Sequence, residues 1–383
     1  MTSPTTYKPP TSSSLFPPER TLIGVVNQSP PIDLAVPYSD EWLRGKTILI
    51  TGGASGFGEG FFRRWATAGA NVIIGDINDK RGKDLVEEVR RSTKNVNLHF
   101  IHCDVTIWQS QVDMFHLALK LSPTGGLDAV VANAGVTDSI DPPFFEPHDL
   151  STDTPKPPNL KCLEVNLIGL TYTTYLAQFY LARNPHSAIV DATAQPGPNR
   201  RDRHLLLLGS IASLGAIPGQ PLYGAAKHGV LGLFRSLRST AVVGGLRINL
   251  LCPYFIDTPL LFAGARILLA GGAMGNPQDV VEAGTRMMAD TRIIGRSLVV
   301  GPKVKFSKDN EFQVVPQNDP NGVETAMWEA YAEDFEIVEA FSERFVRLLN
   351  GIERAKGWGG WVVDMAGAVT YPVRNVLGFK KWF

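Results

Sequence analysis

A tyrosine and a lysine four positions apart, Tyr223 and Lys227, form the first chemical pattern in this sequence. If the segment is helical, positions i and i+4 lie on one face, so a phenol and an ammonium group share one site. A cation beside a phenol stabilises the phenolate and lowers the tyrosine pKa from its ordinary value of about 10. The spacing therefore predicts a general acid/base, with Lys227 lowering the pKa of Tyr223.

A serine hydroxyl is the expected companion of this pair. Ser210 follows the apolar stretch HLLLL at 204–208 and precedes Tyr223 by 13 residues. Ligands bind at the C-terminal ends of strands in open parallel sheets. A hydroxyl at that position can hold a carbonyl or alcohol oxygen beside the phenol. Ser213 offers the same chemistry three residues further on, so both serines remain candidates.

A glycine-rich turn is the second chemical pattern. Residues 46–60, KTILITGGASGFGEG, predict a buried strand, a tight turn and the start of a helix. Glycine lacks a Cβ atom, so the backbone can turn tightly and approach a ligand. The N-terminus of the next helix favours a phosphate. Glycines that serve only helix–strand packing are the alternative interpretation.

An aspartate at the end of the next strand indicates which ligand carries that phosphate. Asp76 lies 18 positions after Gly58, close to the spacing at which a carboxylate reaches the ribose hydroxyls of a dinucleotide. A carboxylate there repels a 2′-phosphate, and the glycine turn holds no Lys or Arg. The sequence therefore predicts NAD rather than NADP. The alternative is an aspartate that only caps the next helix.

The elements that position these residues follow from an alternation of apolar strands and helical patterns after Lys46. Strands are expected at 47–50, 71–76, 97–103, 127–132, 204–208, 246–251 and 297–300. Helices are expected at 57–68, 78–92, 107–121, 160–181, 223–242 and 277–289. This alternation predicts an α/β fold, a Rossmann-type doubly wound parallel sheet of about seven strands with helices on both faces.

Three regions are expected around this sheet: a flexible leader at 1–45, a dinucleotide-binding domain at 46–301 and a C-terminal extension at 302–383. The extension is predicted to be mainly helical, because 323–349 is amphipathic, with a polar loop at 303–321 before it. Residues 184–203 are expected to be a surface insertion. Residues 258–276 are expected to form a lid, with Leu260, Leu261 and Phe262 facing an apolar substrate together with Phe144 and Phe145.

Taken in order, these motifs resemble the short-chain dehydrogenase/reductase family from Lys46 to about Gly301. The motifs are Thr51-Gly52-x-x-x-Gly56-x-Gly58, Asp104 in CDVT, Asn133-Ala134-Gly135, Asn166 in LEVNLIG, Ser210 in GSIAS, Tyr223-x-x-x-Lys227, Asn249 in RINLLCP and Asp257-Thr258-Pro259. The leader and the C-terminal extension resemble those of fungal members, some of which serve secondary metabolism.

The resemblance implies a role for each matching position. Tyr223 would be the general acid/base, Ser210 would orient the reacting oxygen, and Lys227 would bind the nicotinamide ribose. Asn166 would hold a water relay to Lys227, and Ile256 and Thr258 would meet the nicotinamide amide. The implied NAD-binding set is Gly52, Ser55, Gly56, Phe57, Gly58, Asp76, Ile77, Asp104, Val105, Asn133, Ala134, Gly135, Tyr223, Lys227, Ile256 and Thr258.

One position departs from the family pattern. The family has Pro-Gly after the sixth strand, and this chain has Pro253-Tyr254. A tyrosine is less free than glycine to adopt a positive φ, so either the loop differs or the ring shapes the substrate site. This departure weakens the roles carried over to Ile256 and Thr258.

Composition excludes several other classes of protein. The 37 basic and 37 acidic residues balance, so nothing favours a nucleic-acid partner. Three cysteines are too few for a disulfide framework or a zinc site and indicate a reducing compartment. No signal pattern or bilayer-length apolar run is present, so a cytoplasmic location is expected. The aromatic and basic residues at 358–383 leave membrane contact as a minor alternative to protein packing.

The sequence therefore predicts an NAD-dependent dehydrogenase that interconverts a secondary alcohol and a ketone on an apolar small molecule. The expected assembly is a homo-oligomer, a dimer or a tetramer. One alternative is an NADPH-dependent carbonyl or imine reductase. An alternative of another class is a non-catalytic dinucleotide-binding sensor or scaffold. The presence of Asn166, Ser210, Tyr223 and Lys227 together argues against the last, because a sensor needs only the glycine turn and Asp76.

Overall fold

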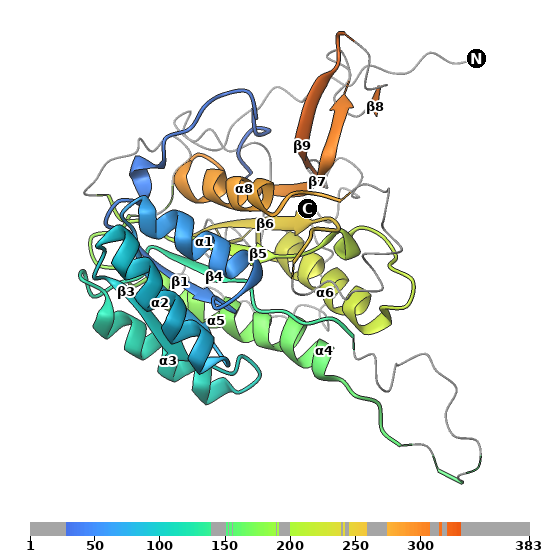
Figure 1. Cartoon of the computed structure of the whole chain (residues 1–383), viewed down its shortest axis with the longest axis horizontal. Helices are drawn as coiled ribbons and strands as arrows, with labels where there is room; N and C mark the ends of the chain where they lie inside the picture. The colour runs from blue at the N-terminus through green and yellow to red at the C-terminus, as the bar shows by residue number, and fades with distance from the viewer. Residues whose placement is uncertain are drawn as a thin grey trace, which may run out of the picture.

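A nine-stranded sheet is the centre of the computed structural model (Figure 1). The structure describes residues 28–138, 151, 153–154, 156–188, 190, 200–238, 240–241, 245–258, 274–306, 314–315 and 320–330. The strands are β1 (Thr47–Thr51), β2 (Asn71–Asp76), β3 (Leu98–His102), β4 (Ala129–Ala132), β5 (His204–Leu208), β6 (Arg247–Pro253), β7 (Ser297–Phe306), β8 (Val314–Val315) and β9 (Val323–Glu329).

Ten helical segments connect these strands in the described part of the chain. They are η1 (Asp40–Leu43), α1 (Gly56–Thr67), α2 (Asp79–Thr93), α3 (Trp108–Leu121), α4 (Lys161–Leu163), η2 (Glu164–Gly169), α5 (Leu170–Leu181), η3 (Ile211–Ser213), α6 (Pro221–Arg238) and α8 (Pro277–Ala289). The segments α4, η2 and α5 are continuous, so the predicted helix at 160–181 forms with a π-helical part, η2, in its first half.

The strand order is β3-β2-β1-β4-β5-β6-β7-β8, and β9 pairs with β7. Strands β1 to β7 are parallel to one another, which confirms the predicted doubly wound sheet of about seven strands. Strands β8 and β9 add to the edge of β7 in antiparallel orientation. Because β2 and β4 lie on opposite sides of β1, the chain changes direction there. That change leaves a crevice at the C-terminal ends of the strands, where such sheets bind ligands.

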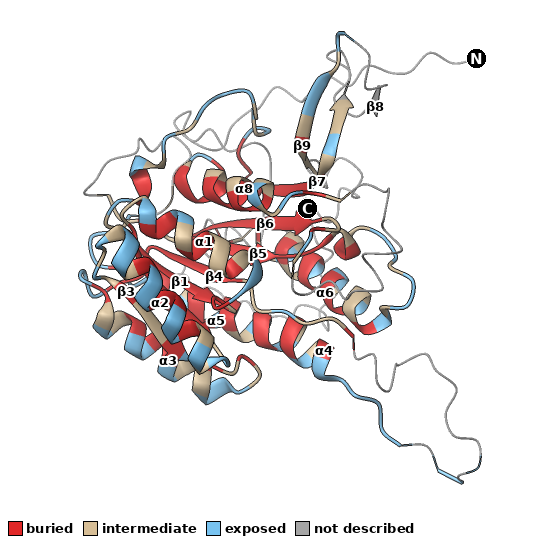
Figure 2. Ribbon diagram, viewed as in Figure 1, coloured by how far each residue is buried: buried red, intermediate tan, exposed pale blue. Residues whose placement is uncertain are grey.

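Helices cover both faces of the sheet, because successive strand residues point to opposite sides. In β1, Ile48 and Ile50 pack with α1, α2 and α8, whereas Leu49 packs with α3, α5 and α6. Buried residues accordingly run through the sheet and along the inner sides of the helices (Figure 2).

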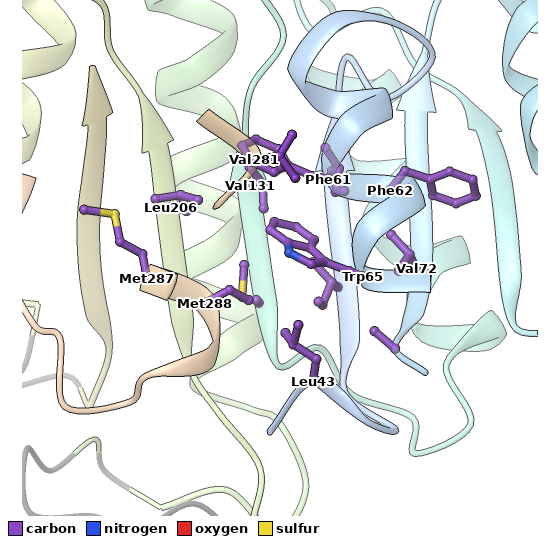
Figure 3. Packing of buried hydrophobic residues seen from close by; sticks show 14 of the residues in the cluster. Leu43, Phe61, Phe62, Trp65, Val72, Val131, Leu206, Val281, Met287 and Met288 are labelled. Atoms are coloured by element: carbon purple, nitrogen blue, oxygen red, sulfur yellow. The ribbon is translucent and has the colours of Figure 1, made fainter. Parts of the chain in front are cut away.

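The first of these two cores is built around Trp65 of α1, which is fully buried. Its ring stacks on Phe61 at 4.8 Å, and its indole N–H donates a 3.0 Å hydrogen bond to Thr285 of α8. Figure 3 shows Leu43, Val281 and Met288 gathered around the same ring. This packing fixes α1, and with it the glycine turn, against the sheet.

Two predictions about the C-terminal region are wrong where the structure describes it. The amphipathic segment that begins at Val323 forms strand β9 over its first seven residues rather than a helix. The polar segment after Lys303 is not all loop, because β7 continues to Phe306 and β8 follows at 314–315. Both outcomes reflect tertiary context: β7 has a free edge, and antiparallel pairing with β9 satisfies its backbone groups. The rest of the predicted helix lies outside the described residues.

Segments from the two ends of the described chain meet at the start of β7. Gln28 donates to the Gly295 carbonyl at 2.9 Å, and Ser29 exchanges hydrogen bonds with Ile294. Arg296 pairs with Glu329 of β9. Among the described helices, none has the length and apolar character needed to cross a membrane.

Candidate active site

A cleft of about 370 Å³ opens at the C-terminal ends of β1, β2, β4 and β5. Its walls contain both chemical patterns that the sequence presents, the glycine turn and the Tyr223–Lys227 pair. Of the predicted NAD-binding residues, all except Gly58 and Ile256 line this cleft. The fold therefore brings together groups that lie more than 170 positions apart in the chain.

The glycine turn approaches the cleft through two residues with positive φ. Gly52 has a φ of +64°, and a Cβ there would lie 2.7 Å from the Ala134 Cα. Gly56 has a φ of +55°, and a Cβ there would project into open space. Gly58 is a packing glycine instead, since its Cβ would lie 2.2 Å from the Gly52 carbonyl oxygen.

Asn133 holds this turn in place from the neighbouring strand. Its amide donates to the carbonyl oxygens of Thr51 at 3.0 Å and Gly52 at 2.9 Å. Ser55 precedes α1 but its side chain does not cap the helix. The first turn of α1 therefore faces the cleft without a capping side chain of its own, and it can accept an anion.

Asp76 stands where β2 ends, beside the same turn. One carboxylate oxygen accepts from the Ala54 N–H and the other from the Asn78 N–H, both at 3.0 Å. Each oxygen keeps a lone pair for a ligand hydroxyl. The nearby cations on α2 are all paired with acids: Arg81 with Glu59 at 2.6 Å, Lys80 with Asp84 at 2.8 Å, and Lys83 with Asp79 at 3.2 Å.

The structure distinguishes Ser210 from Ser213. The Ser210 hydroxyl accepts the Ala212 N–H at 3.1 Å and lies close enough to the Tyr223 phenol to lower its pKa. Ser213 is fully buried, and its hydroxyl accepts the Ser210 backbone N–H at 3.2 Å. Ser210 therefore faces the phenol, whereas Ser213 holds the turn that presents it. The turn before Ser210 also requires a glycine at position 209, because a Cβ there would lie 2.8 Å from the Cys252 sulfur.

The Lys227 side chain is almost completely buried under the cleft. Its Nζ donates a 2.9 Å hydrogen bond to the Leu208 carbonyl oxygen and lies 5.6 Å from the centre of the Tyr223 ring. Burial lowers the pKa of Lys227 from its ordinary value of 10.5 to about 8. A buried ammonium group loses its hydration, so the neutral amine gains relative stability.

The expectation that Lys227 lowers the pKa of Tyr223 is wrong in this structure. Burial raises the pKa of the phenol, and the nearby Ser210 hydroxyl offsets only part of that rise. Desolvation prevails because the phenolate would be buried, and the ammonium group is itself weakened by burial and directed at Leu208. The phenol is therefore protonated at neutral pH.

Asn166 lies in the π-helical segment η2 and is fully buried. Its amide holds Val136 at both backbone groups: Oδ1 accepts the N–H at 2.8 Å, and Nδ2 donates to the carbonyl at 2.7 Å. A Cβ placed on Gly135 would lie 3.1 Å from Asn166 Oδ1 and 3.9 Å from Lys227 Nζ. Asn166, Gly135 and Lys227 therefore converge at one point. π-helical segments such as η2 often occur at functional sites, but the residue pattern alone could not predict this one.

The loop after β6 accommodates Tyr254 at the position where the family pattern has glycine. Tyr254 is not strained, because Lys94 and His186 are the only non-glycine residues with positive φ in the described ranges. Its N–H donates to the Val300 carbonyl at 2.7 Å, and its ring packs edge-on against Phe255 at 5.0 Å. Thr258 lines the cleft, whereas the Ile256 side chain is buried in the core.

Several cleft residues were not predicted from the sequence. They are Cys103, Val136, Lys161, Val165, Leu208, Gly209 and Pro253. Most of them directly follow or end a strand, and that position was the available signal. The three cysteines are buried and unpaired, as expected, and burial raises the pKa of each thiol to about 12. The predicted lid residues Leu260, Leu261, Phe262, Phe144 and Phe145 lie outside the described part of the chain.

Comparisons with known proteins agree with this architecture. A family model described as short chain dehydrogenase matches residues 46–263. A 5′-hydroxyaverantin dehydrogenase of Dothistroma septosporum is 34% identical over 285 residues, covering 71% of this chain and 89% of that protein. The NADP-dependent dehydrogenase M3 of a Phoma species is 35% identical over 264 residues, covering 67% and 74%.

A solved structure supports the fold independently. The crystal structure of a 3-ketoacyl-(acyl-carrier-protein) reductase from Brucella melitensis, complexed with NADH, matches with a TM-score of 0.53 and 24% identity. The match covers 67% of this chain and 97% of that one. The doubly wound sheet and its glycine-rich cleft define a Rossmann-type architecture. The family match makes the protein an oxidoreductase of the class that typically uses a nicotinamide dinucleotide. The chain belongs to the short-chain dehydrogenase family.

Proposed function

We propose that this protein is an NAD-dependent dehydrogenase that oxidises a secondary alcohol to a ketone, reversibly, on an apolar small molecule. The observation that carries the proposal is the position of the Tyr223 phenol, which lies close to the Ser210 hydroxyl and whose ring centre is 5.6 Å from Nζ of the buried Lys227. Tyr223 and Lys227 line one cleft together with the glycine turn and Asp76. A proton-transferring group thus lies beside a binding surface for a dinucleotide.

The residues of the cleft fit a dinucleotide. The open space at Gly56 and the uncapped first turn of α1 suit a pyrophosphate. The free lone pairs of the Asp76 carboxylate suit ribose hydroxyls. Thr258 and Pro253 line the cleft and suit the nicotinamide end. When bound, the nicotinamide accepts or donates the hydride.

The chain's own residues manage position and protons. Ser210 orients the substrate oxygen beside the Tyr223 phenol. In the reducing direction the protonated phenol donates its proton to the carbonyl oxygen. In the oxidising direction the phenolate must form first and then accepts the hydroxyl proton. Because burial raises the pKa of Tyr223, alcohol oxidation should accelerate as the pH rises.

Lys227 and Asn166 are proposed to return the proton to solvent. Lys227, with a pKa lowered to about 8, can exchange a proton near neutral pH more readily than an ordinary lysine can. Asn166 lies next to Lys227 and Gly135, where it can hold a bridging water. Lys227 would also bind the nicotinamide ribose, because its ammonium group lies at the floor of the same cleft.

The choice of NAD rests on the charges around Asp76. A 2′-phosphate would face the carboxylate, and the α2 cations at 80, 81 and 83 are held by acids. The alternative, an NADPH-dependent carbonyl reductase, is favoured by the relative that is named as NADP-dependent. We propose a role in fungal secondary metabolism and an alcohol of the 5′-hydroxyaverantin kind, because a relative is named for that compound.

A cytoplasmic homo-oligomer, a dimer or a tetramer, is proposed as the working form. Supporting it is an exposed aromatic surface where Trp108 of α3 lies beside α5, with Tyr175 at 66% exposure and Phe179 at 47%. Exposed patches of this kind mark interaction surfaces. Light scattering coupled to size-exclusion chromatography measures the subunit number, and a monomer would contradict the proposal.

A turnover screen tests the proposed reaction. Purified protein is given NAD or NADP with secondary alcohols, including 5′-hydroxyaverantin, and NADH or NADPH with the matching ketones. The absorbance of the reduced nicotinamide reports the rate. We expect turnover with NAD and an apolar secondary alcohol. Turnover only with NADPH and ketones supports the reductase instead. Nucleotide binding without turnover of any substrate supports the sensor.

A further inference from the structure

A buried carboxylate outside the predicted site holds the start of the catalytic helix. Asp138 lies in the loop after β4, five residues beyond Asn133, and is 4% exposed. One carboxylate oxygen accepts the Tyr223 N–H at 2.6 Å, and the other accepts the Leu222 N–H at 2.9 Å. The Asp138 N–H donates in return to the Gln220 side-chain oxygen at 3.1 Å.

These bonds complete the N-terminus of α6. The first N–H groups of a helix have no partner within it. Pro221 has no N–H, and the Gly224 N–H reaches the Gln220 carbonyl at 2.9 Å. That leaves the N–H groups of Leu222 and Tyr223, and Asp138 accepts both. A negative charge at this end also interacts favourably with the helix dipole.

The same loop connects the other parts of the site. At its start, Asn133 holds the glycine turn. In its middle, Val136 is held by Asn166 at both backbone groups. At its end, Asp138 holds the helix that carries Tyr223 and Lys227. A shift of this loop would therefore move the proton-transfer groups relative to the nucleotide surface.

A second connection runs from Asp138 to Asn166. The Cys162 thiol donates to the Val136 carbonyl at 3.6 Å, and Asn166 Nδ2 donates to the Cys162 sulfur at 3.2 Å. Burial and the nearby Asp138 carboxylate raise the pKa of this thiol. Cys162 thus lies close to the Asp138 carboxylate, which holds the backbone of the general acid/base, and contacts the side chain proposed for the water relay. Cys162 is buried, so this contact is closed to solvent.

We propose that Asp138 is a positioning residue that sets the place of the Tyr223 phenol against Ser210 and the nucleotide. The proposal rests on the proposed function, because that function makes Tyr223 the acid/base. A displacement of about 1 Å from productive geometry can cost about a hundredfold in rate. Loss of the carboxylate should therefore reduce kcat and leave nucleotide affinity nearly unchanged.

Asp138→Asn tests this with little change in shape. The amide keeps one acceptor oxygen but places an NH₂ group against a backbone N–H. We expect kcat to fall by roughly 10- to 100-fold, with the KM for the alcohol and the Kd for NAD changed by less than about threefold. Asp138→Ala should lower kcat at least as far. A kcat of Asp138→Asn within twofold of the wild type would overturn the proposal.

Asp128→Asn is the matched control. Asp128 is also a buried carboxylate that accepts two backbone N–H groups, from Thr47 at 2.8 Å and Asp202 at 2.9 Å. It lies at the N-terminal ends of β1 and β4, at the opposite edge of the sheet from the cleft. Asp128→Asn should lower the melting temperature and leave the kcat of the folded protein unchanged. An equal fall in kcat in both variants would mean general destabilisation and would overturn the proposal.

A readout without turnover separates this inference from the proposed reaction. Tyrosine labelled with ¹³C at Cζ reports the phenol of Tyr223, with the signal assigned from Tyr223→Phe. We expect Asp138→Asn to shift that signal at neutral pH, and Asp128→Asn to leave it in place. An unshifted signal would overturn the positioning role even if the wild type turns over alcohols. A shifted signal supports it even if no tested alcohol reacts. Failure of Asp138→Asn alone to fold would count against a role specific to Tyr223.

Discussion

The ammonium group of Lys227 lies 5.6 Å from the centre of the Tyr223 ring and donates its 2.9 Å hydrogen bond to the Leu208 carbonyl. The two side chains share one buried site without direct stabilisation of a phenolate. Burial favours the neutral form of both groups, so the pKa of Tyr223 is raised and the pKa of Lys227 is lowered to about 8.

Removal of the lysine charge should change the pH dependence of stability. In the folded protein the pKa of Lys227 is about 8, against 10.5 in the unfolded chain. Between these values the unfolded chain binds more protons, so the free energy of unfolding rises with pH. From about pH 7 to about pH 9.5 the contribution of Lys227 should rise by about 2 kcal/mol.

Lys227→Met lacks this contribution and tests the prediction. Denaturant titration at the two pH values gives the free energy of unfolding of wild type and variant. The difference, wild type minus Met variant, should become more positive by that amount at the higher pH. A difference that does not change with pH would show that Lys227 keeps an ordinary pKa in the folded protein.

Loss of the phenolic hydroxyl should abolish most turnover. Tyr223→Phe keeps the ring, its packing and the Asp138 contacts to the backbone, and removes only the titrating group. We expect kcat to fall by about 10²–10⁴-fold, with the Kd for NAD nearly unchanged by calorimetry. Tyr175→Phe on the exposed face of α5 is the control and should retain full turnover. Retention of a tenth or more of wild-type turnover by Tyr223→Phe would assign proton transfer to another group.

Cofactor preference should depend on one carboxylate. In the wild type we expect NAD to bind at least about tenfold more tightly than NADP, or about 1.4 kcal/mol. Asp76→Ala removes the negative charge that would face a 2′-phosphate and should reduce this ratio severalfold. Asp113→Ala is the control: it changes an exposed aspartate on α3 and should leave the ratio unchanged. Equal or tighter NADP binding by the wild type, measured calorimetrically, would exclude the proposed role of Asp76.

The sequence is a good guide where chemistry and local pattern coincide. The seven parallel strands follow from apolar runs, and two thirds of the cleft residues follow from the glycines, the strand ends and the family motifs. The pKa of Tyr223 could not be predicted, because it depends on burial and on where Lys227 points. Asp138 was missed because its partners, Leu222 and Tyr223, lie 84 and 85 positions away and no local motif connects them.

The C-terminal region shows the opposite limit. The residues at 323–329 follow a helical pattern in the sequence, but in the structure they form β9 and pair with the free edge of β7. Local period cannot reveal a partner strand that lies about 25 positions upstream. In the structure, β9 pairs with β7 along its backbone, and one ion pair at the end of β9 connects Glu329 to Arg296.

This ion pair should hold β9 to the sheet. Arg296 Nε donates to Glu329 Oε1 at 2.6 Å, and its Nη2 donates to Oε2. The guanidinium is 3% exposed and also donates to the Ser29 carbonyl at 3.3 Å, so it connects segments from both ends of the described chain. Removing one partner from a buried pair leaves an uncompensated charge and costs about 3–5 kcal/mol. Glu329→Ala should therefore lower the free energy of unfolding by about that amount in a denaturant titration.

Two further variants distinguish the contribution of the ion pair from the contribution of strand pairing. Glu324→Ala changes an exposed acid in the same strand and should alter stability by no more than about 0.5 kcal/mol. The double variant Arg296→Met with Glu329→Leu removes both charges and should recover most of the loss, because an apolar pair satisfies a buried position without desolvation of ions. If Glu329→Ala is as stable as Glu324→Ala, the ion pair contributes nothing, and backbone pairing alone holds β9 to β7.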